Sequence, residues 1–239
     1  MIVLHNPEGL IGDVLGTVPI MIDLAKQNGG LKVMAHHEAD WLYPLIAHHG
    51  IERIHETSVV NAELDIQEAF RFSQENGTYM GQSWHNQFGL PTPPAAPPDL
   101  EIPDVEVPIY DYIFAPFSRS TPDNQKWVVG RWFQLARKLV QDGNSICVFG
   151  NSKFDSPILG MVNEFDRPMI EVLNILKKCR KGCVSINTGI SHLCYATGTK
   201  NYLLNNQGQG WSVQPDAISI ETYIPRITVD EMLDFIKNN

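Results

Sequence analysis

The sequence predicts an α/β protein of two lobes, each built around a parallel sheet. Short apolar runs suited to strands alternate along the chain with segments whose apolar residues recur every three or four positions. The alternation is interrupted once, by prolines at positions 91, 93, 94, 97, 98, 103 and 108. Dense proline disfavours both helix and central strand and gives an extended connection. We therefore expect an N-terminal lobe at 1–90, a linker at 91–108 and a C-terminal lobe at 109–239.

The N-terminal lobe shows the order strand, helix, strand, helix, strand, helix. A first strand at Ile2–Leu4 precedes turn-forming residues, and a helix follows from Gly12 to Asn28, where two glycines end it. The remaining elements are expected as strands at Leu31–Ala35 and Ile51–His55 and helices at Trp41–His48 and Leu64–Gln74. This alternation is typical of a parallel sheet with crossover helices.

The C-terminal lobe repeats the alternation. Strands are expected at Tyr112–Ala115, Ser145–Phe149, Cys183–Ile186 and Tyr202–Leu204, and helices at Gly130–Gln141, Met169–Lys178, Ser191–Thr197 and Val229–Ile236. The last helix carries a capping-box pair, Thr228 and Glu231, at its start. A second α/β lobe follows the linker.

Composition and charge exclude several classes of function. With 43% hydrophobic and 19% charged residues, the 239-residue chain can bury a core. Its net charge of -9 argues against nucleic acid as a partner, because phosphate-backbone binding needs a basic surface. A locally basic site for one small phosphate remains compatible with this charge. No stretch has the length of a membrane span and Met1 leads directly into a strand, so we expect a cytoplasmic protein.

Two groups of residues invite a metal interpretation, and we predict no metal site at either. Cys147, Cys183 and Cys194 fall inside apolar runs, which favours buried reduced thiols over ligands, although Cys179 and His192 lie near them in the sequence. The doublets at 36–37 and 48–49 are histidine pairs without carboxylate or cysteine partners at metal-site spacing. A solvated or loop role is the preferred interpretation for both doublets.

Three segments carry candidate chemistry. The first, Gly9 to Pro19, places Gly12 and Asp13 where a helix begins. The glycines allow close approach of a ligand to the backbone, and a carboxylate is favoured in the first turn of a helix. The alternative is that Asp13 only complements the helix dipole.

The second segment, Pro116 to Trp127, is a polar loop between an apolar strand and a helix. It offers Ser118, Ser120 and one cation, Lys126, which together suit phosphate oxygens. Loops rich in hydroxyl groups are also common without any ligand.

The third segment, Ser185 to Gly198, gives the strongest local signal. A strand ends there and a helix begins at a turn whose backbone amides can bind an anion, formed by Asn187, Thr188, Gly189 and Ile190. His192 lies in the first turn of that helix. Histidine on a short helix is often only structural, but the Thr-Gly turn before it favours a diphosphate.

Together these segments resemble the family 9 glycosyltransferases, the heptosyltransferases that transfer a heptose from an ADP-sugar to lipopolysaccharide core. The resemblance rests on the GDVLGTVP run, on the order of motifs from Ala115 to Gly150, and on the strand-to-helix turn from Asn187 to Gly198. The family commonly has Asp where this chain has Asn187. The stretch from Gln74 to Leu90 lacks the extra strands that the family has there.

The resemblance implies a GT-B fold of two Rossmann-like lobes, with a reduced N-terminal lobe. It implies that Asp13 is the general base. It assigns the donor diphosphate to Ser118, Ser120, Lys126, Thr188, Gly189, Ile190 and His192, and other cleft positions to Gly12, Asn187, Gly150 and Asn151. The implied reaction is metal-independent and inverting, without a cofactor.

The resemblance also implies the partners, which are an ADP-linked sugar donor and a glycan or lipid-linked glycan acceptor, with peripheral contact to a membrane. Two other functions remain open from the sequence. One is a non-catalytic nucleotide-sugar-binding protein that has lost acceptor recognition. The other is a GT-B relative such as a sugar-nucleotide epimerase, because diphosphate turns of this kind are shared widely.

Overall fold

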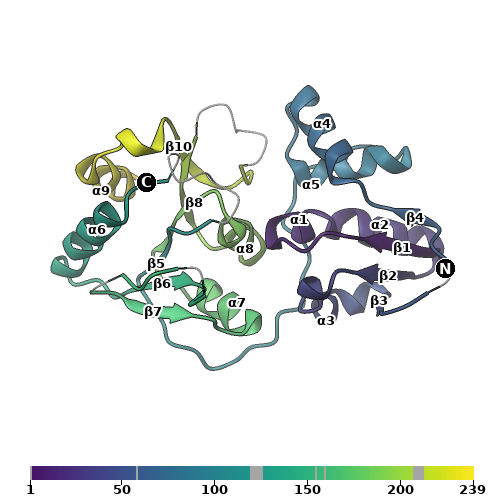
Figure 1. The fold of residues 1–239 in the computed structure, drawn as a ribbon, viewed down its shortest axis with the longest axis horizontal. Coiled ribbons are helices and arrows are strands. Elements are labelled where there is room, and N and C mark those ends of the chain that lie inside the picture. The colour runs from purple at the N-terminus through teal and green to yellow at the C-terminus, as the bar shows by residue number, and fades with distance from the viewer. Residues whose placement is uncertain (1, 58, 119–125, 154, 159, 207–212) are drawn as a thin grey trace. The chain divides into compact units, whose positions relative to one another are not determined.

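The computed structural model describes two compact α/β units (Figure 1). They are Met1–Pro103 and Asp104–Asn239, so the boundary falls inside the proline-rich segment. The described residues are 2–57, 59–118, 126–153, 155–158, 160–206 and 213–239. Each unit has helices around a sheet of parallel strands, which confirms the predicted fold class.

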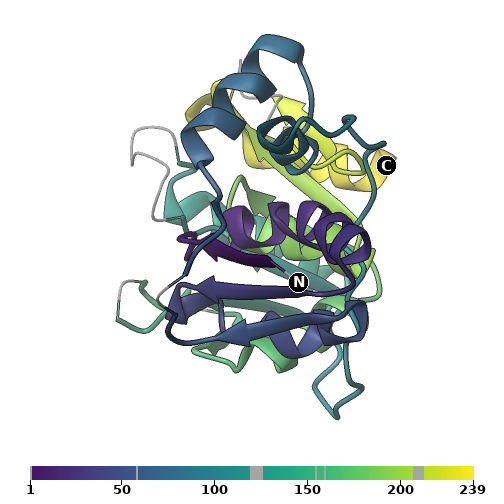
Figure 2. The ribbon, with the colours of Figure 1, turned by 90° about the vertical axis from the view of Figure 1, so that its right-hand side faces the viewer.

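The N-terminal unit contains a four-stranded sheet in the order β3-β2-β1-β4, and every pairing is parallel. Figure 2 shows β1, β2 and β3 side by side. The strands are β1 Ile2–Asn6, β2 Leu31–Ala35, β3 Ile51–Ile54 and β4 Ala62–Glu63. We did not predict β4, because two residues are too few to leave an apolar run.

The single helix expected from Gly12 to Asn28 forms two helices, α1 Ile11–Gly16 and α2 Val18–Asn28. In a continuous helix the ring of Pro19 would clash with the carbonyl of Leu15, and no amide could pair with it. A new helix starting at Val18 places Pro19 in its first turn, where proline is tolerated. Because of this break, α1 is a short separate helix that carries Asp13.

Apart from α4, the other helices of this unit are short. The helix expected at Trp41–His48 is one turn of α-helix followed by a 3₁₀ turn. The stretch at 74–90 contains the end of α4 and two short helices, and none of its residues is in a strand. This bears out the expected lack of extra strands there. The elements are η1 His37–Ala39, α3 Tyr43–Ile46, η2 Ala47–His49, α4 Ile66–Asn76, α5 Met80–Ser83 and η3 Trp84–Phe88.

The C-terminal unit contains a six-stranded parallel sheet in the order β10-β9-β8-β5-β6-β7. We did not predict the two edge strands β7 and β10, because edge strands need fewer apolar residues and theirs are mixed with polar ones. The strands are β5 Tyr112–Ala115, β6 Ile146–Gly150, β7 Val162–Phe165, β8 Gly182–Ile186, β9 Asn201–Asn205 and β10 Ile218–Glu221.

Helices cover both faces of this sheet. Figure 1 shows α6 and α9 together on one side and α7 and α8 on the other. Phe114 of β5 and Trp132 of α6 are fully buried and meet edge to face in the core between the sheet and α6. The helices are α6 Val129–Gln141, α7 Met169–Lys177, α8 Gly189–Thr197, η6 Ile224–Arg226 and α9 Val229–Asn238. Within the described residues, no helix has the length and apolar character needed to cross a membrane.

Candidate functional site

The strand order of the C-terminal unit locates a ligand site. From the central strand β5 the chain proceeds outward to β6 and β7, then returns to β8 and proceeds the other way to β9 and β10. The direction of winding therefore changes between β5 and β8, which pair in register from Tyr112 with Gly182 to Ala115 with Ser185. Loops leaving the carboxyl ends of two such strands diverge and open a crevice where nucleotides bind. Two of the three predicted segments follow these two strands.

The turn between β8 and α8 has the geometry of an anion-binding helix start. Thr188 is the extended N-cap residue, and its amide donates to Ser191 Oγ at 3.3 Å. Ser191 Oγ in turn donates to the carbonyl of Thr188 at 2.6 Å, which locks the turn. Gly189 and Ile190 begin the helix, where backbone N–H groups have no acceptor inside the helix. These half-buried amides can donate to phosphate oxygens and carry the positive end of the helix dipole.

His192 lies in the same first turn but carries no positive charge at pH 7. Its side chain is buried, and this burial lowers the pKa of its imidazole to about 4. The ring is therefore neutral at pH 7 and can donate one N–H bond without adding charge. A diphosphate bound at this turn, as the sequence predicts, would draw positive charge from the α8 amides and from a lysine.

Lys126 is the lysine predicted for this role, and it directly precedes an anchored tryptophan. Trp127 is buried, and its Nε1 donates to the carbonyl of Ile227 at 2.8 Å. Arg131 Nη1 donates to the same carbonyl at 2.8 Å. The start of α6 is thus tied to the segment before α9. Ser118, half-buried, follows β5 as expected, whereas Ser120 lies outside the described residues.

Gly150 ends β6, the neighbour of β5, and Asn151 follows it, so both lie at the same edge of the sheet. A Cβ on Gly150 would lie 2.6 Å from the ring of Phe165, so this glycine is required for packing. The Asn151 amide donates to Asp155 Oδ2 at 2.7 Å, and its side-chain oxygen accepts from Lys153 N at 3.0 Å. These hydrogen bonds between residues of the same loop hold its backbone in place. Ligand binding by Gly150 and Asn151 stays a prediction.

The N-terminal unit has its own change of winding direction, between β1 and β4. The segments that leave these two strands carry Glu8 and Asp13 on one side and Asp65 on the other. Both Asp13 and Asp65 raise the pKa of Glu8, so each of the two carboxyl groups acts on the charge of Glu8. Asp65 is committed to capping α4, where its Oδ1 accepts from Gln67 N at 2.9 Å and Glu68 N at 3.3 Å. Glu8 and Asp13 remain for chemistry.

A buried polar pair holds the β1–α1 loop in place. Asn6, at the end of β1, donates from Nδ2 to Thr17 Oγ1 at 3.0 Å and accepts from Glu8 N at 3.2 Å. Thr17 Oγ1 donates to the carbonyl of Val14 at 2.7 Å. This chain of bonds joins the strand to the break between α1 and α2. It therefore ties the C-terminal end of the short helix that carries Asp13 to β1, while Gly12 is buried within that helix.

The two carboxyl groups have the pKa values of proton-transfer groups. Burial raises the pKa of Asp13 from 3.8 to about 6. Burial, followed by the charges of Asp13 and Asp65, raises the pKa of Glu8 from 4.5 to about 7. A general base works best with a pKa near the working pH. We did not predict Glu8; its signal in the sequence is its place in the loop directly after the first strand.

The raised pKa of Asp13 predicts how stability depends on pH. The folded protein holds this proton more tightly than the unfolded chain, so stability falls as pH rises from about 4 to about 6. At pH 7 the ionised group costs about 1–2 kcal/mol, after discounting the shift for partial exposure. We expect Asp13→Asn to be more stable than wild type by this amount at pH 7 and equal to it near pH 4. Urea unfolding at both pH values measures the difference, and the exposed Asp234→Asn is the control.

All four cysteines are free thiols. Cys147, Cys183 and Cys194 are buried, as predicted, and Cys179 is partly buried. Burial raises the pKa of Cys147 and Cys183 well above the usual range of a thiol. These side chains are part of the core between the sheet and the helices.

Comparisons with known proteins agree on the fold. No family model matches the chain, and no curated protein matches its sequence. Among solved structures, the iron-containing dodecameric glycosyltransferase TibC of enterotoxigenic E. coli matches with a TM-score of 0.77 at 16% identity, over 99% of this chain and 75% of that one. The chain has the fold of the family 9 glycosyltransferases. The E. coli heptosyltransferase WaaC with ADP matches this heptosyltransferase-like fold with a TM-score of 0.73 at 14% identity, over 100% of this chain and 99% of that one.

A family 9 glycosyltransferase from Veillonella parvula supports the same fold, with a TM-score of 0.72 at 10% identity, covering 99% of this chain and 97% of that one. A second TibC structure, in complex with ADP-D-beta-D-heptose, matches with a TM-score of 0.69 at 18% identity. The match covers 91% of this chain and 62% of that one. The TM-scores of these matches establish the heptosyltransferase-like fold. Their identities are too low to show the activity or the substrates, which must be argued from the site.

Proposed function

We propose that this protein is a glycosyltransferase that takes a sugar from a nucleoside diphosphate sugar and passes it to a hydroxyl group. One observation carries the proposal. The winding of the C-terminal sheet changes direction where the Thr188–Gly189 turn offers its amides, and this is where a Rossmann-like unit binds a nucleotide. The donor is inferred to be ADP-linked and heptose-like, because similar folds have been solved with ADP and with ADP-D-beta-D-heptose.

In the proposed reaction Asp13 accepts the proton of the acceptor hydroxyl. The oxygen then forms a bond to the anomeric carbon while the bond from that carbon to the diphosphate oxygen breaks. The electron pair of the broken bond leaves with the nucleoside diphosphate. A single displacement of this kind inverts the configuration at the anomeric carbon. A carboxylate with a pKa of about 6 is ionised at pH 7 and is still basic enough to assist.

The leaving diphosphate gains negative charge during this step. In the proposal, the amides of Gly189 and Ile190 and the ammonium group of Lys126 stabilise that charge, so the reaction needs no metal ion. His192, neutral because it is buried, contributes a hydrogen bond. Losing one such preorganised donor typically costs about 10²-fold or more in rate. The acceptor is inferred to be a glycan or a lipid-linked glycan.

The first test is a calorimetric titration with ADP, UDP, GDP and their sugar conjugates. We expect one diphosphate ligand to bind selectively and Lys126→Ala to weaken it at least about tenfold, since a charge-assisted bond contributes about 1.5–3 kcal/mol. The matched control is Lys177→Ala, which removes an exposed lysine in the last turn of α7. Equal binding by all three proteins, or no binding to any ligand, would refute the donor site.

A non-catalytic nucleotide-sugar-binding protein is the second candidate. It is supported by the stretch at 74–90, which contains short helices and no strand, as expected for a reduced N-terminal lobe. Selective donor binding without transfer to any glycan, and without hydrolysis, would support this function. Transfer that disappears in Asp13→Asn would exclude it.

A further inference from the structure

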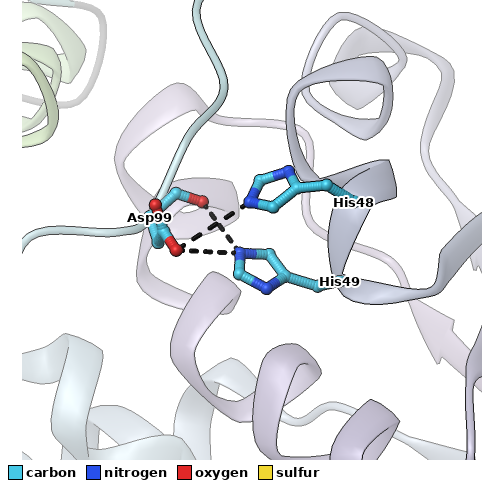
Figure 3. A group of neighbouring side chains, drawn as sticks. All are labelled: His48, His49 and Asp99. Atoms are coloured by element: carbon cyan, nitrogen blue, oxygen red, sulfur yellow. Dashed lines mark hydrogen bonds and ion pairs between the residues drawn. The ribbon is translucent and has the colours of Figure 1, made fainter.

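Two adjacent imidazoles lie together on the N-terminal unit, and neither has a role in the proposed reaction. His48 and His49 belong to η2, which ends at Gly50 in the left-handed conformation, with φ of 74°. Their ring centroids are 3.8 Å apart, at an interplanar angle of 42°. Neighbouring residues usually direct their side chains differently, but this tight turn brings both rings to one side (Figure 3).

The proline-rich segment brings a carboxylate to this pair. Asp99 Oδ2 lies 3.3 Å from His49 Nε2 and 3.8 Å from His48 Nε2. Two constraints hold the segment in place. Pro97 and Pro98 restrict the backbone before Asp99, and the amide of Glu101 after it donates to the carbonyl of Leu45 in α3 at 2.8 Å. All the residues involved belong to one compact unit.

The arrangement has the dimensions of a metal site. Ligand atoms about 2.0–2.1 Å from a tetrahedral Zn²⁺ lie about 3.3 Å from one another. The separation of His49 Nε2 and Asp99 Oδ2 equals this value, and the one involving His48 exceeds it by half an ångström. The three ligand atoms all lie within 4.8 Å of one another, and they form the one such group among the described residues. Rotation of two exposed side chains, His48 and Asp99, closes the remaining gap.

Glu101 adds a second feature that metal sites share. Its Oε2 lies 3.7 Å from His48 Nδ1, the ring nitrogen opposite the one that faces Asp99. A carboxylate on the far nitrogen of a ligating histidine orients the ring and raises its basicity. When Nδ1 of His48 carries the proton on the side of Glu101, Nε2 keeps its lone pair for a metal ion.

We propose that His48, His49 and Asp99 bind a divalent transition-metal ion, Zn²⁺ in the first instance. Two imidazole nitrogens and one carboxylate oxygen suit Zn²⁺, Co²⁺ and Ni²⁺, whereas Ca²⁺ and Mg²⁺ select oxygen ligands. Three protein ligands leave the fourth position to water. The bound ion joins the end of α3–η2 to the proline-rich segment and so fastens the start of the connection to the N-terminal unit. The proposal is independent of the glycosyltransferase function.

Calorimetric titration of the full-length, tag-free protein with Zn²⁺ tests the site. We expect one saturable site, whose occupation raises the melting temperature, and visible absorption of tetrahedral character when Co²⁺ replaces Zn²⁺. His49→Ala and Asp99→Asn each remove a ligand and should abolish saturable binding, and Glu101→Gln should weaken it about 10–100-fold. The matched control is His37→Ala, because it removes an exposed histidine from the other doublet, whose rings are 4.3 Å apart.

Each outcome decides the question. Absence of saturable Zn²⁺ and Co²⁺ binding in the wild type would overturn the proposal, as would equal loss in His37→Ala. Retained binding in Asp99→Asn would also overturn it. Asp99 is 72% exposed, so its conversion to asparagine leaves the fold intact, and far-UV circular dichroism confirms this for every variant.

Discussion

Asp13→Asn is expected to lower the rate of sugar transfer by about 10²–10⁴-fold while leaving donor binding unchanged. Asparagine has nearly the shape of aspartate but cannot accept the proton of the acceptor hydroxyl. The proposed donor groups belong to the other unit of the chain, so their contacts with the diphosphate do not depend on this side chain. Steady-state kinetics with the donor identified by calorimetry measure the loss, and the same titration checks binding.

The pH profile of the wild-type enzyme gives an independent view of the same residue. Because Asp13 must be ionised to act as base, kcat/KM should rise with pH up to about 6 and then level. Glu8→Gln removes the neighbouring carboxyl group and is the matched comparison. It should change the profile near pH 7 and leave most of the turnover. Full turnover in Asp13→Asn, at any pH, would contradict the assigned role.

The second large effect is expected from Gly189→Pro, which removes a single amide hydrogen from the diphosphate turn. Gly189 is the first residue of α8, a position where proline fits the helix, and Thr188 before it is extended, as a residue before proline must be. The helix should therefore survive while one donor to the phosphate is lost. We expect donor affinity to fall at least about tenfold, the value of a hydrogen bond to a charged group.

Ile66→Pro is the control, because Ile66 begins α4 in the N-terminal unit after the extended Asp65. It tests the cost of proline at a helix start that has no proposed ligand. Equal donor affinity in Gly189→Pro and the wild type would show that the α8 amides do not bind the diphosphate. Thermal unfolding of both variants separates lost binding from lost structure.

Local signals in the sequence predicted the strand, turn and helix from β8 to α8 but not their surroundings in the sheet. The run from Ser185 to Gly198 contains an apolar strand, a Thr-Gly turn and a helix, and each of these is decided by near neighbours. The order of the strands in the sheet is decided by long-range packing. The change of winding between β5 and β8 could therefore not be predicted from the sequence. Pro19 is a different case. Its signal is local, and the expected continuous helix was wrong because the clash of its ring with the preceding turn was not considered.

The residues that sequence reasoning missed depend on contacts between distant segments. The pKa of Glu8 is raised by burial first, then by Asp13 five positions away and by Asp65 more than fifty positions away; burial, the largest cause, is not visible as spacing. His48 and His49 were expected to be solvated because no carboxylate is close in sequence. The carboxylate that faces them, Asp99, arrives through the path of the proline-rich segment. Short-range patterns therefore identified the backbone turns more successfully than the partners of side chains.

The carbonyl of Ile227 accepts from both Trp127 Nε1 and Arg131 Nη1, and Trp127 is separated from it by 100 positions in the chain. Local unfolding opens a protein in cooperative blocks. Since the start of α6 and the start of α9 share this acceptor, they belong to one block, and fraying of the C-terminal helix loosens the segment that carries Lys126. If Lys126 holds the nucleotide as proposed, ligand binding should slow the opening of α9, and hydrogen exchange in α9 would report on binding at the other end of the shared contact.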